Sequence, residues 1–364
     1  MRAAVFYGAG DLRIETRGDP SPRQGEVVIK VLACGVCGTD AHEYAAGPVM
    51  YPVTRRHEVT GHLGPLVPGH EFAGTVVALG PGVEDLAPGE LVAGAAPLLC
   101  GSCRWCRSGR SNLCAGYATV GLHRDGALAQ YCALPAESCL PIRDGGLGPD
   151  ALALAQPTAI AVHARARSRV AAGESALVIG VGGVGAFLTL ALASASVPVW
   201  AVDLDERRLA AAGALGARGT LIAPESQALG EALGDQGFLP DVIFEASGTR
   251  AGLDSAFQVA KRGTRIVVVG LQGEGATFDA RSLAVDEVEI IGTNAFARAL
   301  DLPEAVRLLA EDPQRLRALA PTALPLSETV EGALAPMARG APLQVKTLID
   351  PWSKRPRPTR MTPS

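Results

Sequence analysis

Metal-binding side chains occur in two separate segments early in the chain. Residues 33–42 read Ala-Cys-Gly-Val-Cys-Gly-Thr-Asp-Ala-His, and residues 67–74 read Val-Pro-Gly-His-Glu-Phe-Ala-Gly. Thiolate, imidazole and carboxylate groups are the ligands that zinc takes in proteins. A strand-like run precedes the first segment, at 27–32, and another follows the second, at 75–79. If turns of one β scaffold carry both segments, their cysteine, histidine and acid can converge on a single metal.

A second group of cysteines is confined to one loop. Cys100, Cys103, Cys106 and Cys114 follow the pattern Cys-x2-Cys-x2-Cys-x7-Cys among Gly, Ser and Arg residues. Four thiolates close a tetrahedral shell with no open position, as in structural zinc sites. An iron–sulfur cluster is the alternative, because bacterial ferredoxins also begin with Cys-x2-Cys-x2-Cys. The last spacing of seven instead of three, and Ala115 instead of proline after the fourth cysteine, favour zinc.

The stretch from 176 to 205 has the pattern that a dinucleotide requires. An apolar run at 176–179 enters a turn with Gly180, Gly182 and Gly185, and a helical pattern follows. Gly180 permits the turn, Gly182 lets backbone N–H groups approach the pyrophosphate, and Gly185 lets helix and strand pack closely. A second apolar run ends at Asp203, whose carboxylate would meet the adenosine ribose and favour NAD over NADP. The residues expected to face NAD are Gly180, Gly182, Gly183, Val184, Gly185, Asp203 and Arg208.

Strand and helix patterns alternate around this turn. Strand-like runs recur at 241–246, 265–270 and 288–292, with helix-like segments at 207–215 and 253–260. Such alternation predicts a Rossmann-type, doubly wound parallel sheet in an α/β protein. Before it, short apolar runs alternate with Pro and Gly turns, which is typical of an antiparallel β domain.

The composition limits the possible partners. Net charge is −4 over 364 residues and the charges are spread along the chain, so we expect neither nucleic acid nor a membrane surface as a partner. The N-terminal apolar run is too short for a signal peptide, and no run of about 20 apolar residues could span a bilayer. Clustered cysteines fit metal ligation in a reducing compartment, so we expect a cytoplasmic protein. We expect its partner to be a small-molecule substrate.

With these motifs in this order, the sequence resembles the zinc-dependent medium-chain alcohol dehydrogenases, from its start to about residue 348. Within the family it is most similar to the polyol branch, which includes butanediol, sorbitol and threonine dehydrogenases. The segments that carry the resemblance are Cys-Gly-Thr-Asp-Ala-His at 37–42, Gly-His-Glu at 69–71, the four-cysteine loop, Val-His-Ala at 162–164 and the Gly-rich turn.

The resemblance implies both architecture and activity. It implies a GroES-like catalytic domain at 1–155, completed by 296–350, and a Rossmann domain at 156–295. It implies hydride transfer between NAD(H) and a zinc-bound secondary alcohol or ketone, with a diol, polyol or cyclitol-like substrate. Two zinc ions per subunit and a homodimer or homotetramer are further implications. The Pro-, Lys- and Arg-rich residues 351–364 predict a mobile tail or a subunit contact.

Position by position, the resemblance implies a catalytic zinc held by Cys37, His70 and Glu71, with Glu71 as a ligand or a nearby carboxylate that moves onto the metal. One position departs from the branch: Gln156-Pro157 stands where these enzymes usually have Glu-Pro, whose glutamate faces the zinc. Gln156 would bind the zinc directly or through water, although a neutral amide oxygen is a weaker ligand. Without a working zinc, the alternative is a medium-chain reductase that reduces an activated C=C or C=N bond.

The resemblance also implies the residues that handle the proton. Thr39 would take the alcohol proton and His42 would pass it to solvent, while Asp40 would orient the His70 ring. The catalytic residues implied are therefore Thr39, His42, Glu71 and Asp40.

Other histidines have weaker patterns. His-Glu-Val-Thr-Gly-His at 57–62 is similar to a metalloprotease helix motif, but its spacing is one residue too long for one helical face, and Gly61 disfavours a helix. We expect a loop without a metal there. His123 has no partner that the sequence identifies.

Overall fold

The structure, a computed structural model, describes four stretches of the chain: residues 1–143, 146–223, 228–273 and 275–363. Contacts divide the chain into two compact units, one of Met1–Gln156 with Ala297–Ser364 and one of Pro157–Phe296. The first unit includes the C-terminal segment that was expected to stand apart. That each unit is an independent domain with the expected bounds stays a prediction.

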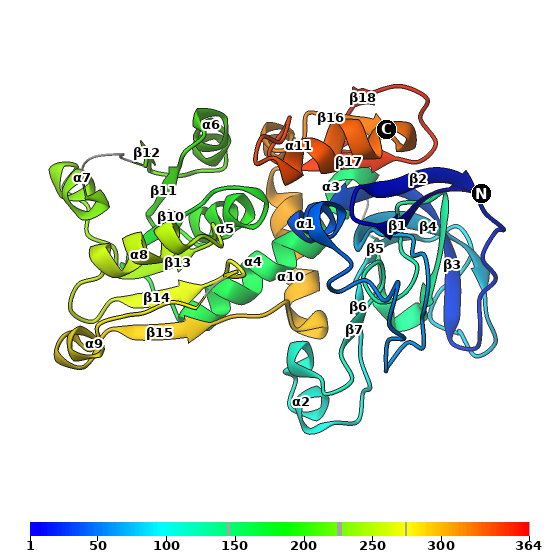
Figure 1. The fold of residues 1–364 in the computed structure, drawn as a ribbon, viewed down its shortest axis with the longest axis horizontal. Coiled ribbons are helices and arrows are strands. Elements are labelled where there is room, and N and C mark those ends of the chain that lie inside the picture. The colour runs from blue at the N-terminus through cyan, green and yellow to red at the C-terminus, as the bar shows by residue number, and fades with distance from the viewer. Residues whose placement is uncertain (144–145, 224–227, 274, 364) are drawn as a thin grey trace. The chain divides into compact units, whose positions relative to one another are not determined.

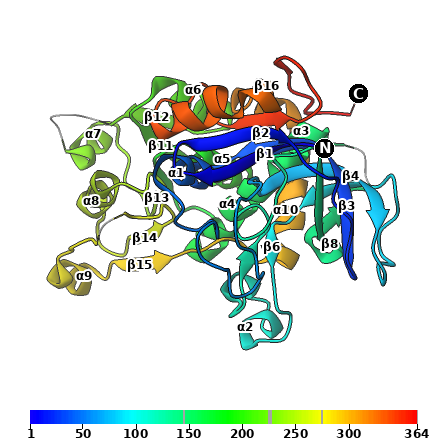
Figure 2. The same cartoon turned by 45° about the vertical axis from the view of Figure 1, so that its right-hand side comes forward.

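The unit Pro157–Phe296 contains a six-stranded sheet in the order β12-β11-β10-β13-β14-β15, and every neighbouring pair is parallel. Figures 1 and 2 show these strands side by side, coloured green to yellow. The strand order reverses at β10, as in doubly wound dinucleotide-binding sheets, so the predicted fold class is confirmed. The strands are β10 (Ala176–Ile179), β11 (Val199–Asp203), β12 (Gly219–Ile222), β13 (Val242–Glu245), β14 (Arg265–Val268) and β15 (Glu289–Gly292).

Apolar side chains are buried on both faces of this sheet. Leu177, Ile243 and Ile266 belong to one cluster with residues of α7 (Leu229–Asp235) and α8 (Arg250–Val259). Alternate residues such as Val178 and Phe244 point to the other face and are fully buried as well. Strands buried on both faces are apolar throughout, which made them recognisable in the sequence. The other helices are α4 (Ala155–Ser168), which begins in the first unit, α5 (Gly183–Ser194), α6 (Glu206–Ala214) and α9 (Ala280–Asp286).

The unit Met1–Gln156 with Ala297–Ser364 is built on an eight-stranded sheet. Its long strand β3 (Glu26–Val36) is antiparallel to β4 (Glu71–Leu79), β8 (Tyr131–Pro135) and β17 (Thr347–Asp350). A strand from the end of the chain therefore lies beside a strand from its beginning. The remaining strands are β5 (Leu91–Gly94), β9 (Cys139–Pro141), β16 (Thr322–Pro325) and β18 (Arg357–Pro358).

Shorter elements surround this sheet. They are β1 (Arg2–Gly8), β2 (Asp11–Thr16), α1 (Gly38–Ala46), β6 (Pro97–Leu98), α2 (Arg104–Arg107), η1 (Ser111–Leu113), β7 (Ala118–Thr119), η2 (Ala136–Ser138), α3 (Pro149–Ala153), α10 (Arg298–Glu311), η3 (Pro313–Ala318), η4 (Leu326–Glu328), η5 (Thr329–Leu334) and α11 (Ala335–Ala338). Across the described stretches of both units, no helix combines the length and apolar character needed to cross a membrane.

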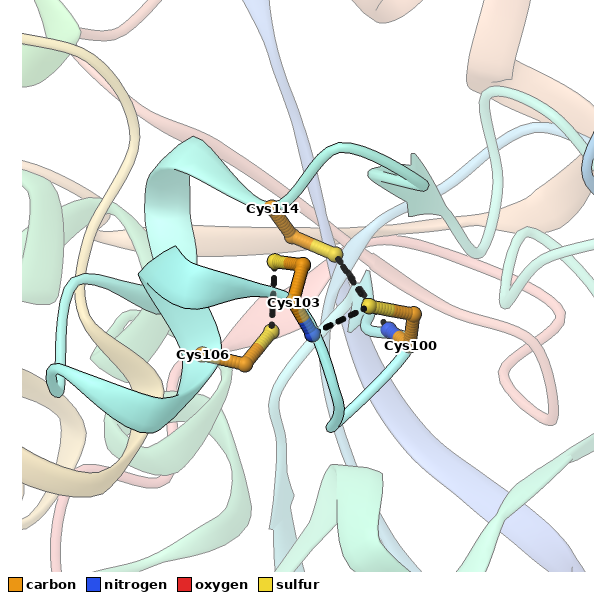
Figure 3. Close-up of side chains that lie close together, drawn as sticks. All are labelled: Cys100, Cys103, Cys106 and Cys114. Atoms are coloured by element: carbon orange, nitrogen blue, oxygen red, sulfur yellow. Dashed lines mark hydrogen bonds between the residues drawn. The ribbon is translucent and has the colours of Figure 1, made fainter.

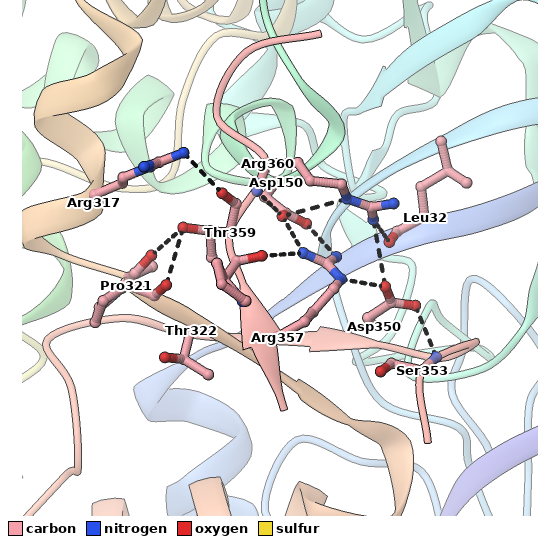
Figure 4. Close-up of polar contacts among 12 residues, drawn as sticks. Leu32, Asp150, Arg317, Pro321, Thr322, Asp350, Ser353, Arg357, Thr359 and Arg360 are labelled. Atoms are coloured by element: carbon pink, nitrogen blue, oxygen red, sulfur yellow. Dashed lines mark hydrogen bonds and ion pairs between the residues drawn. The ribbon is translucent and has the colours of Figure 1, made fainter. Parts of the chain in front are cut away.

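The C-terminal segment was expected to be a mobile tail or a subunit contact; in residues 351–363 the structure contradicts the mobile tail, and the subunit contact stays a prediction. β18 pairs with β16, and Met361 is fully buried. Arg357 donates to both oxygens of the fully buried Asp150, at 2.7 and 3.0 Å, and to Asp350 at 2.7 Å (Figure 4). Two of the basic residues that suggested a solvated tail, Arg357 and Arg360, are therefore partners of buried carboxylates, which seldom lie inside a protein unpaired.

Candidate functional site

Cys37, His70 and Glu71 come together in the folded chain. One ligand atom from each lies within 4.8 Å of the others. The register of the sheet explains this, because β3 pairs antiparallel with β4 and places Gly35 opposite Glu71. Residues just after β3 then lie beside residues just before β4. A Cβ on Gly35 would lie 2.2 Å from Glu71 Oε2, so only glycine leaves room for that carboxylate.

The strand on the other side of β3 adds Lys346, which the sequence did not single out. Thr347 of β17 pairs with Val36, so Lys346 is level with Cys37 in the sheet. Its ammonium donates to Glu71 Oε1 at 2.6 Å and also contacts Oε2. Lys346 is 4% exposed and Glu71 is 1% exposed, so this ion pair is shielded from water. Burial opposes the charged ammonium, but Glu71 and Cys37 outweigh it and raise the pKa of Lys346.

Asp40 links the ligand segments. It lies in the first turn of α1, where it accepts from the Cys37 N–H at 2.9 Å and from the Tyr51 hydroxyl at 2.7 Å. Its Oδ1 is 3.6 Å from Nδ1 of His70. Burial disfavours a charged imidazole, but Asp40 and Cys37 outweigh it and raise the pKa of His70 to about 9. The same anionic surroundings favour a divalent cation.

The residues present fit a zinc ion. Among the described residues, Gln156 Oε1 and His70 Nδ1 are buried polar atoms without a hydrogen-bond partner. Leaving such a group unsatisfied costs about 1–3 kcal/mol; Asp40 Oδ1 lies 3.6 Å from His70 Nδ1, whereas the Gln156 oxygen requires a partner that the described residues do not provide. Thiolate, imidazole and carboxylate are zinc ligands, and an amide oxygen can complete a mixed set.

Helix α1 carries the residues expected to handle a proton. Thr39 Oγ1 lies 3.8 Å from Cys37 Sγ. His42 follows one turn later on the same face of the helix and is exposed to solvent. The hydroxyl of Thr39 beside the Cys37 thiol is thus followed by an imidazole in contact with water.

The four-cysteine lobe also fits zinc (Figure 3). The sulfurs of Cys100 and Cys114 are 3.4 Å apart, and those of Cys103 and Cys106 are 3.7 Å apart. Thiolates bound to one tetrahedral zinc lie about 3.8 Å apart, whereas a disulfide holds its sulfurs at about 2 Å. Backbone N–H groups of Ser102 and Cys103 lower the pKa of Cys100 to about 6, which favours the thiolate that a metal needs.

The Gly-rich turn has the geometry of a phosphate-binding loop. Gly180 has φ +86°, and a Cβ on Gly185 would lie 1.9 Å from Gly180 O, so the turn and α5 pack backbone to backbone. A Cβ added to Gly182 or Gly183 would have almost no neighbouring atoms, so there is space in front of the N-terminus of α5. Asp203, at the end of β11, accepts the Val181 N–H at 2.8 Å.

Comparison with known proteins identifies the family. Residues 23–144 match the family model described as alcohol dehydrogenase GroES-like domain, and residues 183–311 match zinc-binding dehydrogenase. The chain is 33% identical to an L-threonine 3-dehydrogenase of Saccharopolyspora erythraea over 80% of this chain and 83% of the relative. It is 31% identical to a sorbitol dehydrogenase of Bacillus subtilis, over 85% of this chain and 86% of the relative. The chain belongs to the zinc-dependent medium-chain alcohol dehydrogenases.

The fold of this dehydrogenase agrees with that assignment. The crystal structure of 2R,3R-butanediol dehydrogenase from Bacillus subtilis superimposes with a TM-score of 0.88 at 29% identity, covering 96% of this chain and 99% of the other. The expected resemblance to the polyol branch is thereby confirmed.

Two features of this dehydrogenase escaped the sequence analysis. Lys346 has no partner close in sequence, and only the pairing of β17 with β3 brings it to Glu71. Glu245, fully buried at the end of β13, accepts from the N–H groups of Ser247 and Gly248 and from Gln272 Nε2 at 2.7 Å, so it organises the loop after that strand. An acid ending an otherwise apolar strand was a usable signal for Glu245, whereas Lys346 had none.

Proposed function

We propose that the protein transfers a hydride between NAD(H) and a secondary alcohol or its ketone, with a diol, polyol or cyclitol-like substrate. The carrying observation is the set of Cys37, which is half-buried, with the buried His70 and Glu71, together with the unpaired amide oxygen of Gln156. When bound, zinc polarises the alcohol oxygen as a Lewis acid and NAD accepts the hydride. Cys37 and His70 would hold the metal, with Glu71 and Gln156 completing its shell.

The remaining groups orient the ligands and move the proton. Asp40 fixes the start of α1 through the Cys37 N–H and lies beside the His70 ring. Thr39, next to Cys37, accepts the substrate proton, and the exposed His42 releases it to water. Lys346 holds Glu71 against the sheet, so that the carboxylate keeps a partner whether or not it binds the metal.

NAD would bind at the turn Gly180–Gly185 with its pyrophosphate at the N-terminus of α5, facing Gly182, Gly183 and Val184. Asp203 would accept from the ribose hydroxyls, and its negative charge disfavours a 2′-phosphate. Arg208 lies 3.4 Å from Asp203 Oδ1 and would flank the adenosine.

A zinc-free reductase of an activated C=C or C=N bond is the second candidate, favoured by the neutral Gln156. Zinc content separates the two. We expect two zinc ions per subunit in the purified protein, one in a Cys37→Ala variant and one in a Cys100→Ala variant. NAD-linked oxidation of secondary alcohols should disappear only with the Cys37 zinc. One zinc in the parent, unchanged by Cys37→Ala, would refute zinc catalysis and direct the substrate search to activated double bonds.

We also propose that the enzyme is a homodimer or homotetramer in the cytoplasm. Exposed apolar side chains of Phe278, Val285 and Ile290 lie in and around α9 and the edge strand β15, which supports a partner on that face. The thiols of the four-cysteine lobe fit a reducing compartment. Light scattering after size exclusion tests the first proposal, since the mass of one chain would contradict it. Recovery of the protein outside the cytoplasmic fraction would contradict the second.

A further inference from the structure

Two histidines outside the proposed metal site are stacked on each other. The rings of His57 and His123 lie with centroids 4.3 Å apart and planes at 30°. The Nδ1 atom of His57 accepts from the Thr60 N–H at 3.2 Å, and that of His123 accepts from the Thr119 N–H at 2.9 Å. With Nδ1 used as an acceptor, the neutral ring carries its proton on Nε2. Within the stretches that the structure describes, neither Nε2 has a hydrogen-bond partner.

This pair is anchored beside the metal ligand His70. The turn that carries His123 packs against the residue just before His70: a Cβ on Gly121 or Gly126 would lie 2.2 or 2.3 Å from Gly69 O. The Ala127 N–H also donates to Gly69 O at 2.9 Å. Only glycines allow such a close approach of two backbones, so the position of His123 relative to His70 is fixed by the main chain.

The environment keeps His123 uncharged at neutral pH. Burial, His57 and His70 lower its pKa to about 4. Arg124 is paired with Glu26 at 2.8 Å and Arg56 donates to Gly61 O at 2.7 Å, while Arg55 and Glu58 act on the pKa of His57 in opposite directions. An uncharged N–H donor suits a hydroxyl or carbonyl oxygen, whereas a guanidinium would select a carboxylate or phosphate.

We propose that His123, held by its stack on His57, determines specificity by donating from Nε2 to a second hydroxyl oxygen of the substrate. The pair thereby favours a diol or polyol over a simple secondary alcohol. This inference rests on the proposed function and deepens it, because it assigns the diol preference to a named donor outside the metal shell.

The test compares 2,3-butanediol with 2-butanol in the zinc-loaded enzyme with NAD. His123→Phe keeps an aromatic ring for the stack and removes the donor. We expect kcat/KM for the diol to fall about fivefold to tenfold, the value of one neutral hydrogen bond, while kcat/KM for 2-butanol stays within about twofold. His62→Phe is the matched control, because that ring contacts Gly64 O instead of the stack, and it should leave the ratio of the two substrates unchanged.

An equal fall for both alcohols, or a lower melting temperature with an unchanged ratio, would show that His123 only supports the loop and would overturn the inference. If the parent oxidises neither alcohol, the proposed function fails separately. Ligand-observed NMR of the two alcohols with the zinc-loaded protein then decides the role of His123. Diol binding that exceeds 2-butanol binding in the parent, and loses that excess in His123→Phe, supports it; equal binding overturns it.

Discussion

The buried ion pair of Lys346 and Glu71 allows the sharpest test of the metal site. Both side chains are almost fully buried, and Lys346 contacts both carboxylate oxygens. Lys346→Met keeps the volume of the side chain but leaves Glu71 charged and without its partner. Removing one member of a buried pair costs about 3–5 kcal/mol, and solvent screening does not reduce this value here because neither group is exposed. Lys354→Met, on an exposed lysine of the same unit, should change stability by less than about 0.5 kcal/mol.

The double variant Lys346→Met, Glu71→Gln removes both charges and should recover most of that loss. The coupling energy from the double-mutant cycle of the parent, the two single variants and the double variant is therefore expected to be about 3 kcal/mol. Zinc supplies a second positive charge for Glu71, so the loss caused by Lys346→Met should be smaller in zinc-loaded protein than after chelation.

Denaturant titration followed by tryptophan fluorescence measures these differences. Trp200 is the tryptophan of the unit Pro157–Phe296, so a Trp200→Phe background leaves Trp105 and Trp352 to report on the other unit. If the free energy of unfolding of Lys346→Met lies within about 1 kcal/mol of the parent value, Lys346 does not compensate the charge of Glu71. The same conclusion follows if the double variant is as unstable as Lys346→Met. An equal loss with and without zinc would refute the expected contact between Glu71 and the metal.

Three further predictions concern other parts of the chain. Asp203→Ala should weaken NAD binding, measured by NADH fluorescence titration, while zinc content stays unchanged; equal affinity would mean that the ribose is bound elsewhere. Arg357→Met removes the bidentate partner of the buried Asp150, which among the described residues keeps only the Arg360 N–H and Arg360 Nε at 3.7 Å, and should destabilise the first unit by about 1–3 kcal/mol, whereas Arg355→Met on the surface should not, and equal effects would contradict the role of the pair. Because the pKa of His123 is about 4 in the folded protein and about 6.5 when unfolded, the unfolded chain binds the proton more tightly and stability should fall as pH drops from about 6.5 to 4. In His123→Phe the free energy of unfolding should depend less on pH between about 6.5 and 4, and an unchanged pH dependence would contradict this role of His123.

The sequence predicts the inner strands of the doubly wound sheet well because they are buried on both faces, whereas the half-exposed edge strand β12 was not predicted. Residues 176–179 form β10 with the same bounds, and the turn after them contains the expected glycines. The proposed metal ligands could be singled out for a different reason, since Cys37 and the pair His70 and Glu71 each lie in short, distinctive segments, and the structure brings them together.

Features that depend on long-range register were not predictable in this way. Lys346 follows Gly-Ala-Pro-Leu-Gln-Val at 340–345, which carries no signal for a lysine that pairs with a distant carboxylate, and its role depends on the pairing of β17 with β3. The stack of His57 on His123 joins two loops far apart in sequence. Composition was misleading for residues 351–363, because arginines that pair with buried carboxylates have the same sequence signature as arginines in solvent.

If Gln156 completes the zinc shell as proposed, the charges at the site account for both Gln156 and Lys346. Cys37, Asp40 and Glu71 contribute three negative charges when ionised and Lys346 contributes one positive charge, so the set carries −2 while His70 is neutral. A divalent zinc balances that charge in a site shielded from water. A glutamate at position 156 would leave the filled site with surplus negative charge, whereas the amide supplies an oxygen without one. Gln156 is therefore compatible with a retained zinc.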